Sequence, residues 1–133
     1  TLWGTAGHAQ ADAAHTQSLN NGYNGYDVNY GSGLHGLNST ASSNGYHGYH
    51  FAWNVAAAIQ DSTAEGNTLS GVASYLGSSF SAAALTTKAN LQYGMDLDST
   101  VVTELASATH TANQVGREVC HSRDQFCENT LGG

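Results

Sequence analysis

The chain has 133 residues, of which only three are basic and ten are acidic, for a formal net charge of −7. So few cations exclude nucleic acid and anionic membrane surfaces as partners, because both are bound through clustered Lys and Arg side chains. The length fits one domain over residues 1–133, and no apolar run reaches the length of a membrane span.

The composition favours an extracellular protein. Charged residues make up 10% of the chain, against about 25% in an average soluble domain. Ala, Ser, Thr, Asn and Gly take their place. A first residue of Thr rather than Met favours a processed mature chain. We therefore expect a secreted protein.

The first third of the chain predicts a helix, a strand and a loop. An Ala-rich stretch without strand-forming residues favours a helix near residues 5–19, which ends before a Gly-containing turn. Tyr26, Val28 and Tyr30 alternate with polar residues, which predicts a strand near 26–30. The Gly-, Tyr-, Ser- and Asn-rich segment that follows, about 31–46, is expected to be a flexible loop. Within it, Asn38 opens a glycosylation sequon.

The rest of the chain predicts two more strands and two more helices. Tyr49, Phe51, Trp53 and Val55 recur at every second position, which predicts a strand near 47–55 whose large side chains enter the core. Strict alternation also predicts a strand near 86–97. Apolar residues spaced by three and four predict helices near 56–77 and 99–119.

These elements predict an α+β fold, a small two-layer sandwich with the helices packed on a mostly antiparallel sheet. The Gly-Tyr pairs that begin at residues 22, 25, 45 and 48 are interpreted as local, so no internal repeat is expected. Cys120 and Cys127 are the two cysteines of the chain, and their closeness predicts one disulfide that closes the loop 120–127.

One short string points to catalysis. The stretch "MDLDSTVV" resembles the first motif of the haloacid dehalogenase phosphatases. The resemblance implies Asp96 as nucleophile, Asp98 as acid/base and Thr100 in the hydroxyl position, with magnesium between carboxylates. It covers about six residues, and the later Lys and acidic pair of that family are absent. As an alternative, Asp98 caps the helix predicted to follow. We expect a non-enzymatic protein, with no catalytic residue and no cofactor.

The histidines offer a metal site. On the predicted first helix, His8, Asp12 and His15 share one face, and this spacing suits zinc or copper. The alternative is that the seven histidines are solvated surface residues. Their protonation near pH 6 would move the net charge toward zero.

We expect the protein to act by binding. Tyrosine supplies contact area and a hydroxyl at low entropic cost, and the candidate binding residues are Tyr23, Tyr26, Tyr30, His35, Tyr46 and His47. The build is similar to that of small secreted fungal killer toxins and effectors, which implies a toxin-, effector- or recognition-type protein with a protein or cell-surface target.

The alternative function is self-assembly. The low charge removes repulsion between copies. Residues 22–50 are rich in Gly, Tyr and His, a composition similar to that of cuticle- and beak-type structural proteins. This similarity implies a subunit of an extracellular matrix or filament, whose partners are copies of itself.

Overall fold

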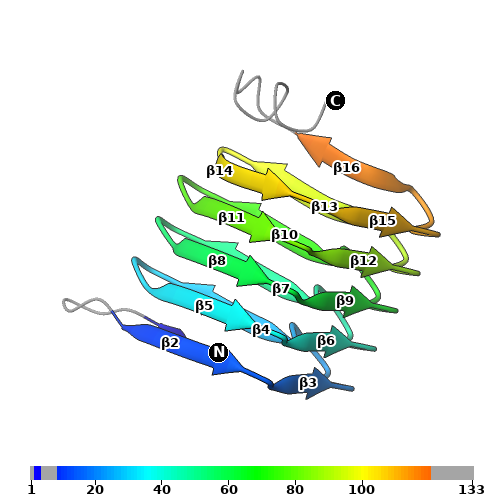
Figure 1. Ribbon diagram of the computed structural model, residues 1–133, viewed down its shortest axis with the longest axis horizontal. Helices are drawn as coiled ribbons and strands as arrows, with labels where there is room; N and C mark the ends of the chain where they lie inside the picture. Colours follow the sequence, from blue (N-terminus) through cyan, green and yellow to red (C-terminus); the bar gives the residue numbers. More distant parts are fainter. Residues whose placement is uncertain (1, 4–8, 121–133) are drawn as a thin grey trace.

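The protein is a β-solenoid. The computed structural model describes residues 2–3 and 9–120, and every regular element in this part of the chain is a β-strand. No helix suited to crossing a bilayer occurs among these residues. Figure 1 shows the strands as stacked, nearly identical layers, with β2 and β3 at one end of the stack and β14 and β15 near the other.

The strands follow one another in triplets after a short first strand. We call each triplet a rung. The strands are β1 (Leu2–Trp3); β2 (Gln10–Ala14), β3 (Gln17–Leu19) and β4 (Tyr26–Asn29); β5 (Gly33–Leu37), β6 (Thr40–Ser42) and β7 (Tyr49–Ala52); β8 (Ala56–Gln60), β9 (Thr63–Glu65) and β10 (Val72–Tyr75); β11 (Ser79–Ala83), β12 (Thr86–Lys88) and β13 (Tyr93–Asp98); and β14 (Val101–Ala106), β15 (Thr109–Thr111) and β16 (Gly116–Cys120).

Equivalent strands of successive rungs pair in parallel and form three sheets. Sheet 1 has the order β1-β4-β7-β10-β13-β16, sheet 2 the order β14-β11-β8-β5-β2, and sheet 3 the order β15-β12-β9-β6-β3. Each rung therefore contributes one strand to each sheet and bonds to the rungs before and after it. This is the one-dimensional construction of solenoid proteins.

The register of the sheets defines a repeat of 23 residues. Tyr26 lies beside Tyr49, Tyr49 beside Val72, and Val72 beside Met95. Among the five rungs the register slips once, between β11 and β14, where Ser79 lies beside Val101 but Ser81 lies beside Glu104. There the corner after β13 is one residue shorter than its equivalents, and a bulge at Thr103 restores the repeat.

The chain turns between sheets at corners with left-handed backbone. The same corner positions recur in every rung, and positive φ angles occur at His15, Asn38, Asp61, Ala84 and Ser107, at Asn20, Ser43, Gly66, Ala89 and Ala112, and at Tyr30, Trp53, Leu76 and Ser99. Such angles are unfavourable for residues other than glycine. Ladder hydrogen bonds hold them in place: the His15 amide donates to the Leu37 carbonyl at 2.9 Å, and the Asn38 amide to the Gln60 carbonyl at 3.0 Å.

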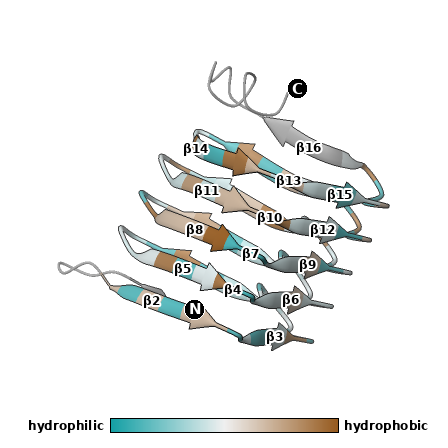
Figure 2. Ribbon diagram, in the orientation of Figure 1, coloured by the Kyte–Doolittle hydropathy of each residue, from teal (hydrophilic) through white to brown (hydrophobic). Residues whose placement is uncertain are grey.

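The core fills the inside of the solenoid. Alternate strand residues point inward, and Tyr49, Phe51, Ile59, Phe80 and Leu97 are almost completely buried. Figure 2 shows this uneven polarity: β8 is hydrophobic along most of its length, whereas β3 at the N-terminal edge is largely hydrophilic. The inward-facing side chains of successive rungs pack together as one continuous apolar core.

The predicted α+β sandwich is wrong, because the described chain is all β and its strands pair in parallel. The range 5–19 contains β2 and β3, the range 56–77 contains β8 to β10, and the range 99–119 contains β14 to β16. The predicted loop at 31–46 contains β5 and β6. Strands do occupy 26–29 and 49–52, while the range 86–97 holds two strands separated by a corner.

The spacing of apolar residues by three and four, which wrongly predicted a helix near 99–119, has a structural cause. Val102 is fully buried and Leu105 packs against the core. They lie three residues apart because the bulge at Thr103 adds a residue between two inward positions. Short strands joined by tight corners thus imitate the spacing of an amphipathic helix. The Gly-Tyr pairs were also misread, since residues 22 and 45, and 25 and 48, are equivalent positions of the 23-residue repeat.

Candidate functional site

The predicted binding tyrosines do not form one surface, because the repeat distributes them over different corners and sheets. Tyr23 stacks on Tyr46 with ring centroids 4.9 Å apart, and both rings are exposed at the corner before sheet 1. Tyr30 stacks on Trp53 at 4.6 Å, at the corner after sheet 1. Both pairs join equivalent positions of the first two rungs.

The other predicted binding residues are packed differently. Tyr26 lies against the core and stacks on Tyr49 at 4.9 Å, while its hydroxyl lies 2.7 Å from Thr16 Oγ1. His35 lies on the outer face of sheet 2, and its Nδ1 is 3.6 Å from Asp12 Oδ1. His47 is buried, and its ring stacks on His50 at 5.7 Å.

A polar cluster lies on the outer face of sheet 1, and His47 belongs to it. Asp27 Oδ1 is 2.8 Å from His50 Nδ1 and also accepts a 2.8 Å hydrogen bond from Asn29 Nδ2. Because the carboxylate only accepts, His50 carries a proton on Nδ1. Further along the sheet, Tyr75 Oη donates to Asp96 Oδ2 at 2.8 Å, and the Tyr75 ring meets the edges of both histidine rings.

Burial governs the acid–base behaviour of this cluster. It lowers the pKa of His47 from 6.5 to about 4, with a smaller contribution from His50. Burial raises the pKa of Asp27, but the hydrogen bonds from His50 and Asn29 outweigh it, and the net shift is downward. Burial and the hydrogen bond to Asp96 raise the pKa of the Tyr75 hydroxyl. His47 is thus held neutral at physiological pH, and its Nδ1 accepts the Ser70 amide at 3.2 Å.

The phosphatase-like string has a structural explanation in the solenoid. Asp96 is bound by Tyr75, and Thr100 is buried, where its hydroxyl donates to the Ser74 carbonyl at 2.6 Å. The strand β14 follows Asp98, so the expected cap of a helix at this position is wrong. The strand-then-helix context of the phosphatase motif is therefore absent.

The premise of the predicted metal site is wrong, since Asp12 lies on a strand rather than on a helix. His15 occupies the corner after that strand, and His8 lies outside the described residues. Within the described part of the chain, no group of three His, Cys, Asp or Glu side chains could hold a metal ion. A metal at His8, Asp12 and His15 stays a prediction.

The remaining predicted sites lie at the edge of what the structure describes. No disulfide occurs among the described residues: Cys120 ends β16, and its predicted partner Cys127 lies outside them. Asn38, the predicted glycosylation position, is exposed at a corner of the second rung with a φ angle of 49°. Its modification stays a prediction.

The feature that unites the rungs is a ladder of asparagines, which the sequence-based reasoning missed. One asparagine follows each sheet 3 corner, and together Asn21, Asn44, Asn67, Asn90 and Asn113 form the asparagine ladder. Each of the first four donates its side-chain amide to the Oδ1 atom of the next at 2.8 to 2.9 Å, and its backbone amide to the same atom at 3.0 to 3.1 Å. The 23-residue spacing of these asparagines was visible in the sequence.

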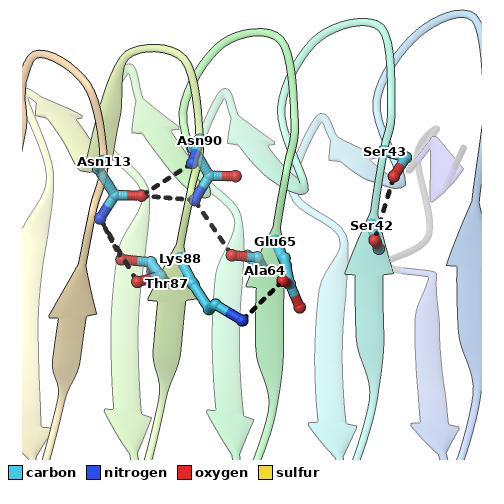
Figure 3. Close-up of polar contacts among 8 residues, drawn as sticks. All are labelled: Ser42, Ser43, Ala64, Glu65, Thr87, Lys88, Asn90 and Asn113. Carbon is cyan, nitrogen blue, oxygen red and sulfur yellow. Dashed lines mark hydrogen bonds and ion pairs between the residues drawn. The ribbon is translucent and has the colours of Figure 1, made fainter.

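The asparagine ladder also ties each corner to the sheet 3 strand of the preceding rung. Asn90 Nδ2 donates to the Ala64 carbonyl at 3.1 Å, and Asn113 Nδ2 contacts the carbonyl and hydroxyl oxygens of Thr87. Figure 3 shows these bonds between neighbouring corners, beside the exposed ion pair of Lys88 and Glu65. Asn67 and Asn90 are fully buried, so their amide groups depend on the ladder for hydrogen bonds.

The N-terminal end of the solenoid is hollow and apolar. A cavity of about 260 Å³ lies inside the first rung and is lined by Ala11, Ala13, Gly25, Tyr26, Asp27, Val28 and Leu34. The lining residues of β2 are more exposed than their counterparts deeper in the stack: Ala13 retains 9% of its exposure, whereas Ile59 retains 1%. The apolar core is therefore incompletely covered at this end.

Comparison with protein-family models, with curated proteins and with solved structures finds no match to this chain.

Proposed function

We propose that this chain is a self-assembling subunit of an extracellular fibre or matrix, the alternative that its composition suggested. The observation that carries the proposal is the stacking of identical side chains across rungs at the spacing of β-strands. The asparagine ladder and the stacked pairs Tyr23–Tyr46 and Tyr26–Tyr49 are of this kind. Asparagine ladders and stacked aromatics are the contacts that stabilise polymers of stacked β-strands.

The edge of the solenoid supports the same function. Within the described residues, β2 and β3 end their sheets and each has one strand neighbour. Soluble proteins protect such edges with Lys, Pro or bulges. The sequence of β3 (QSL) contains no charged residue and no Pro, and that of β2 (QADAA) contains only the charge of Asp12, so these backbone edges are weakly protected and favour pairing with another strand.

Sedimentation velocity and electron microscopy over a range of concentrations, at neutral and mildly acidic pH, test this function. We expect ordered polymers without any added target. A protein that stays monomeric under every condition would contradict the proposal and favour the binding-type function predicted from the sequence. That function, with its protein or cell-surface target, otherwise stays a prediction.

A further inference from the structure

The geometry points to a head-to-tail interface, in which β14 and β15 of one copy dock on β2 and β3 of another, since β1 already pairs with β4 at the edge of sheet 1. This inference rests on the proposed self-assembly and specifies its contact surface. Within the described part of the chain, the asparagine ladder begins at Asn21 and ends at Asn113. All its asparagine-to-asparagine bonds run in one direction, with the donor one rung before the acceptor. A head-to-tail contact preserves this direction, because Asn113 of one copy would donate to Asn21 of the next.

The two ends also match in register. Asn113 and Asn21 are separated by 92 residues, which is four repeats of 23. The same offset sets β15 of one copy beside β3 of the next, with Thr109 opposite Gln17 in the outward column of sheet 3. Neighbouring strands would then lie about 4.8 Å apart, as they do within a sheet.

A partner that docks on the N-terminal end must also cover the apolar surface of the hollow there, and a second copy of the chain does so. The hollow of about 260 Å³ at the N-terminal end is lined mainly by small and apolar core residues. At the other end, Val102 is already buried, whereas Leu105 is only partly buried and packs against the core. Stacking the two ends continues the column of inward side chains from one copy into the next. Covering the hollow and the exposed part of Leu105 would remove apolar area from water, which favours association.

One row of equivalent outward side chains places two like charges at the proposed contact, and this makes the contact testable. On the outer face of sheet 2, Asp12, His35, Ala58, Ser81 and Glu104 occupy equivalent positions of the five rungs. Head-to-tail docking sets Glu104 of one copy against Asp12 of the next. Both side chains are exposed, and like charges directly opposite each other on neighbouring strands are destabilising.

Charge variants of the full chain test this pairing. We expect Glu104→Gln to lower the critical concentration for polymer formation about two- to five-fold, since it removes the repulsion. Glu104→Lys should lower it further, and the double variant Glu104→Lys/Asp12→Lys should lose that gain. Ala58→Lys is the matched control, because it changes the net charge by the same amount as Glu104→Gln but lies in the middle rung. An equal effect of Ala58→Lys and Glu104→Gln would overturn the inference.

Chemical cross-linking locates the contact directly. Two single-cysteine proteins, Gln17→Cys and Thr109→Cys, are made in a background that carries Cys120→Ser and Cys127→Ser. They are mixed and treated with a short bis-maleimide. Cross-linked dimers are expected from this mixture but not from Gln17→Cys mixed with Thr63→Cys, whose new thiol lies in the middle rung. Polymers that cross-link through position 63 would overturn the head-to-tail interface and leave self-assembly intact. Absence of polymers would contradict the proposed function itself.

Discussion

Asn44 donates both its backbone amide and its side-chain amide to a single atom, the Oδ1 of Asn67, at 3.1 and 2.9 Å. Asn67 repeats the arrangement on Asn90 at 3.0 and 2.9 Å. Because all three side chains are buried, each loses its bonds to water and recovers them from the next rung. The ladder therefore couples the stability of one rung to the presence of its neighbours.

Removing a central member of the ladder should destabilise the whole fold. Asn67→Ala removes the common acceptor of the backbone and side-chain amides of Asn44, and it leaves Asn90 Oδ1 with only the bond from the backbone amide of residue 67. Unsatisfied buried groups cost about 1–3 kcal/mol each, so we expect a loss of at least about 2 kcal/mol in the free energy of unfolding, measured by urea denaturation. Asn21→Ala is the control: its side chain is exposed, and its loss should cost about 1 kcal/mol or less. Equal losses would contradict the role assigned to burial.

A glycine beside the ladder permits the close approach of two rungs. A Cβ atom at Gly48 would lie 2.6 Å from the Gly71 carbonyl oxygen and 2.9 Å from Asn67 Nδ2. Gly48→Ala should therefore lower the free energy of unfolding by about 2–4 kcal/mol, through strain in the corner. Gly22→Ala is the matched control, since its Cβ would meet nothing within 4 Å, and its effect should stay within about 0.5 kcal/mol. Similar thermal unfolding of the two variants would count against this packing.

Protonation of His47 should make stability depend on pH. Its pKa is about 4 in the folded protein, whereas an unperturbed histidine has a pKa of 6.5. Between these values the unfolded chain binds a proton that the folded chain does not, so stability is greatest above pH 6.5 and falls as the pH drops toward 4. The pKa of Asp27 is also lowered in the folded protein. Its contribution to stability is lost at more acidic pH, as the carboxylate is protonated.

The His47 contribution can be isolated by substitution. The full shift in the pKa of His47 corresponds to at most about 3 kcal/mol in the free energy of unfolding. This change is spread over the interval between pH 6.5 and 4. In urea denaturation at several pH values, His47→Gln should flatten the slope in this interval. His35→Gln, on the exposed outer face of sheet 2, should leave the slope in place. An unchanged slope in His47→Gln would refute the assignment.

Some of the strands were predictable from the residues themselves. The alternation of Tyr49 and Phe51 with His50 and Ala52 predicts a strand with one buried face, and both aromatic rings are fully buried. The repeat was also present in the sequence, since "NGYNGY" at 21–26 and "NGYHGY" at 44–49 lie 23 residues apart. Interpreting these pairs as local removed the one signal that identifies a solenoid.

The choice between helix and strand was decided by tertiary structure. The segment Ala56–Gln60 (AAAIQ) has high helix propensity, yet it forms β8 because it pairs with β5 on one side and β11 on the other. Its neighbours in the fold lie 23 residues away in each direction, so no local pattern contains them. Corners such as Ala84 and Trp53, with φ angles of 53° and 61°, are unfavourable alone and persist through ladder bonds to adjacent rungs. The sequence by itself determined which side chains can be buried, and the stacking of rungs decided the backbone that buries them.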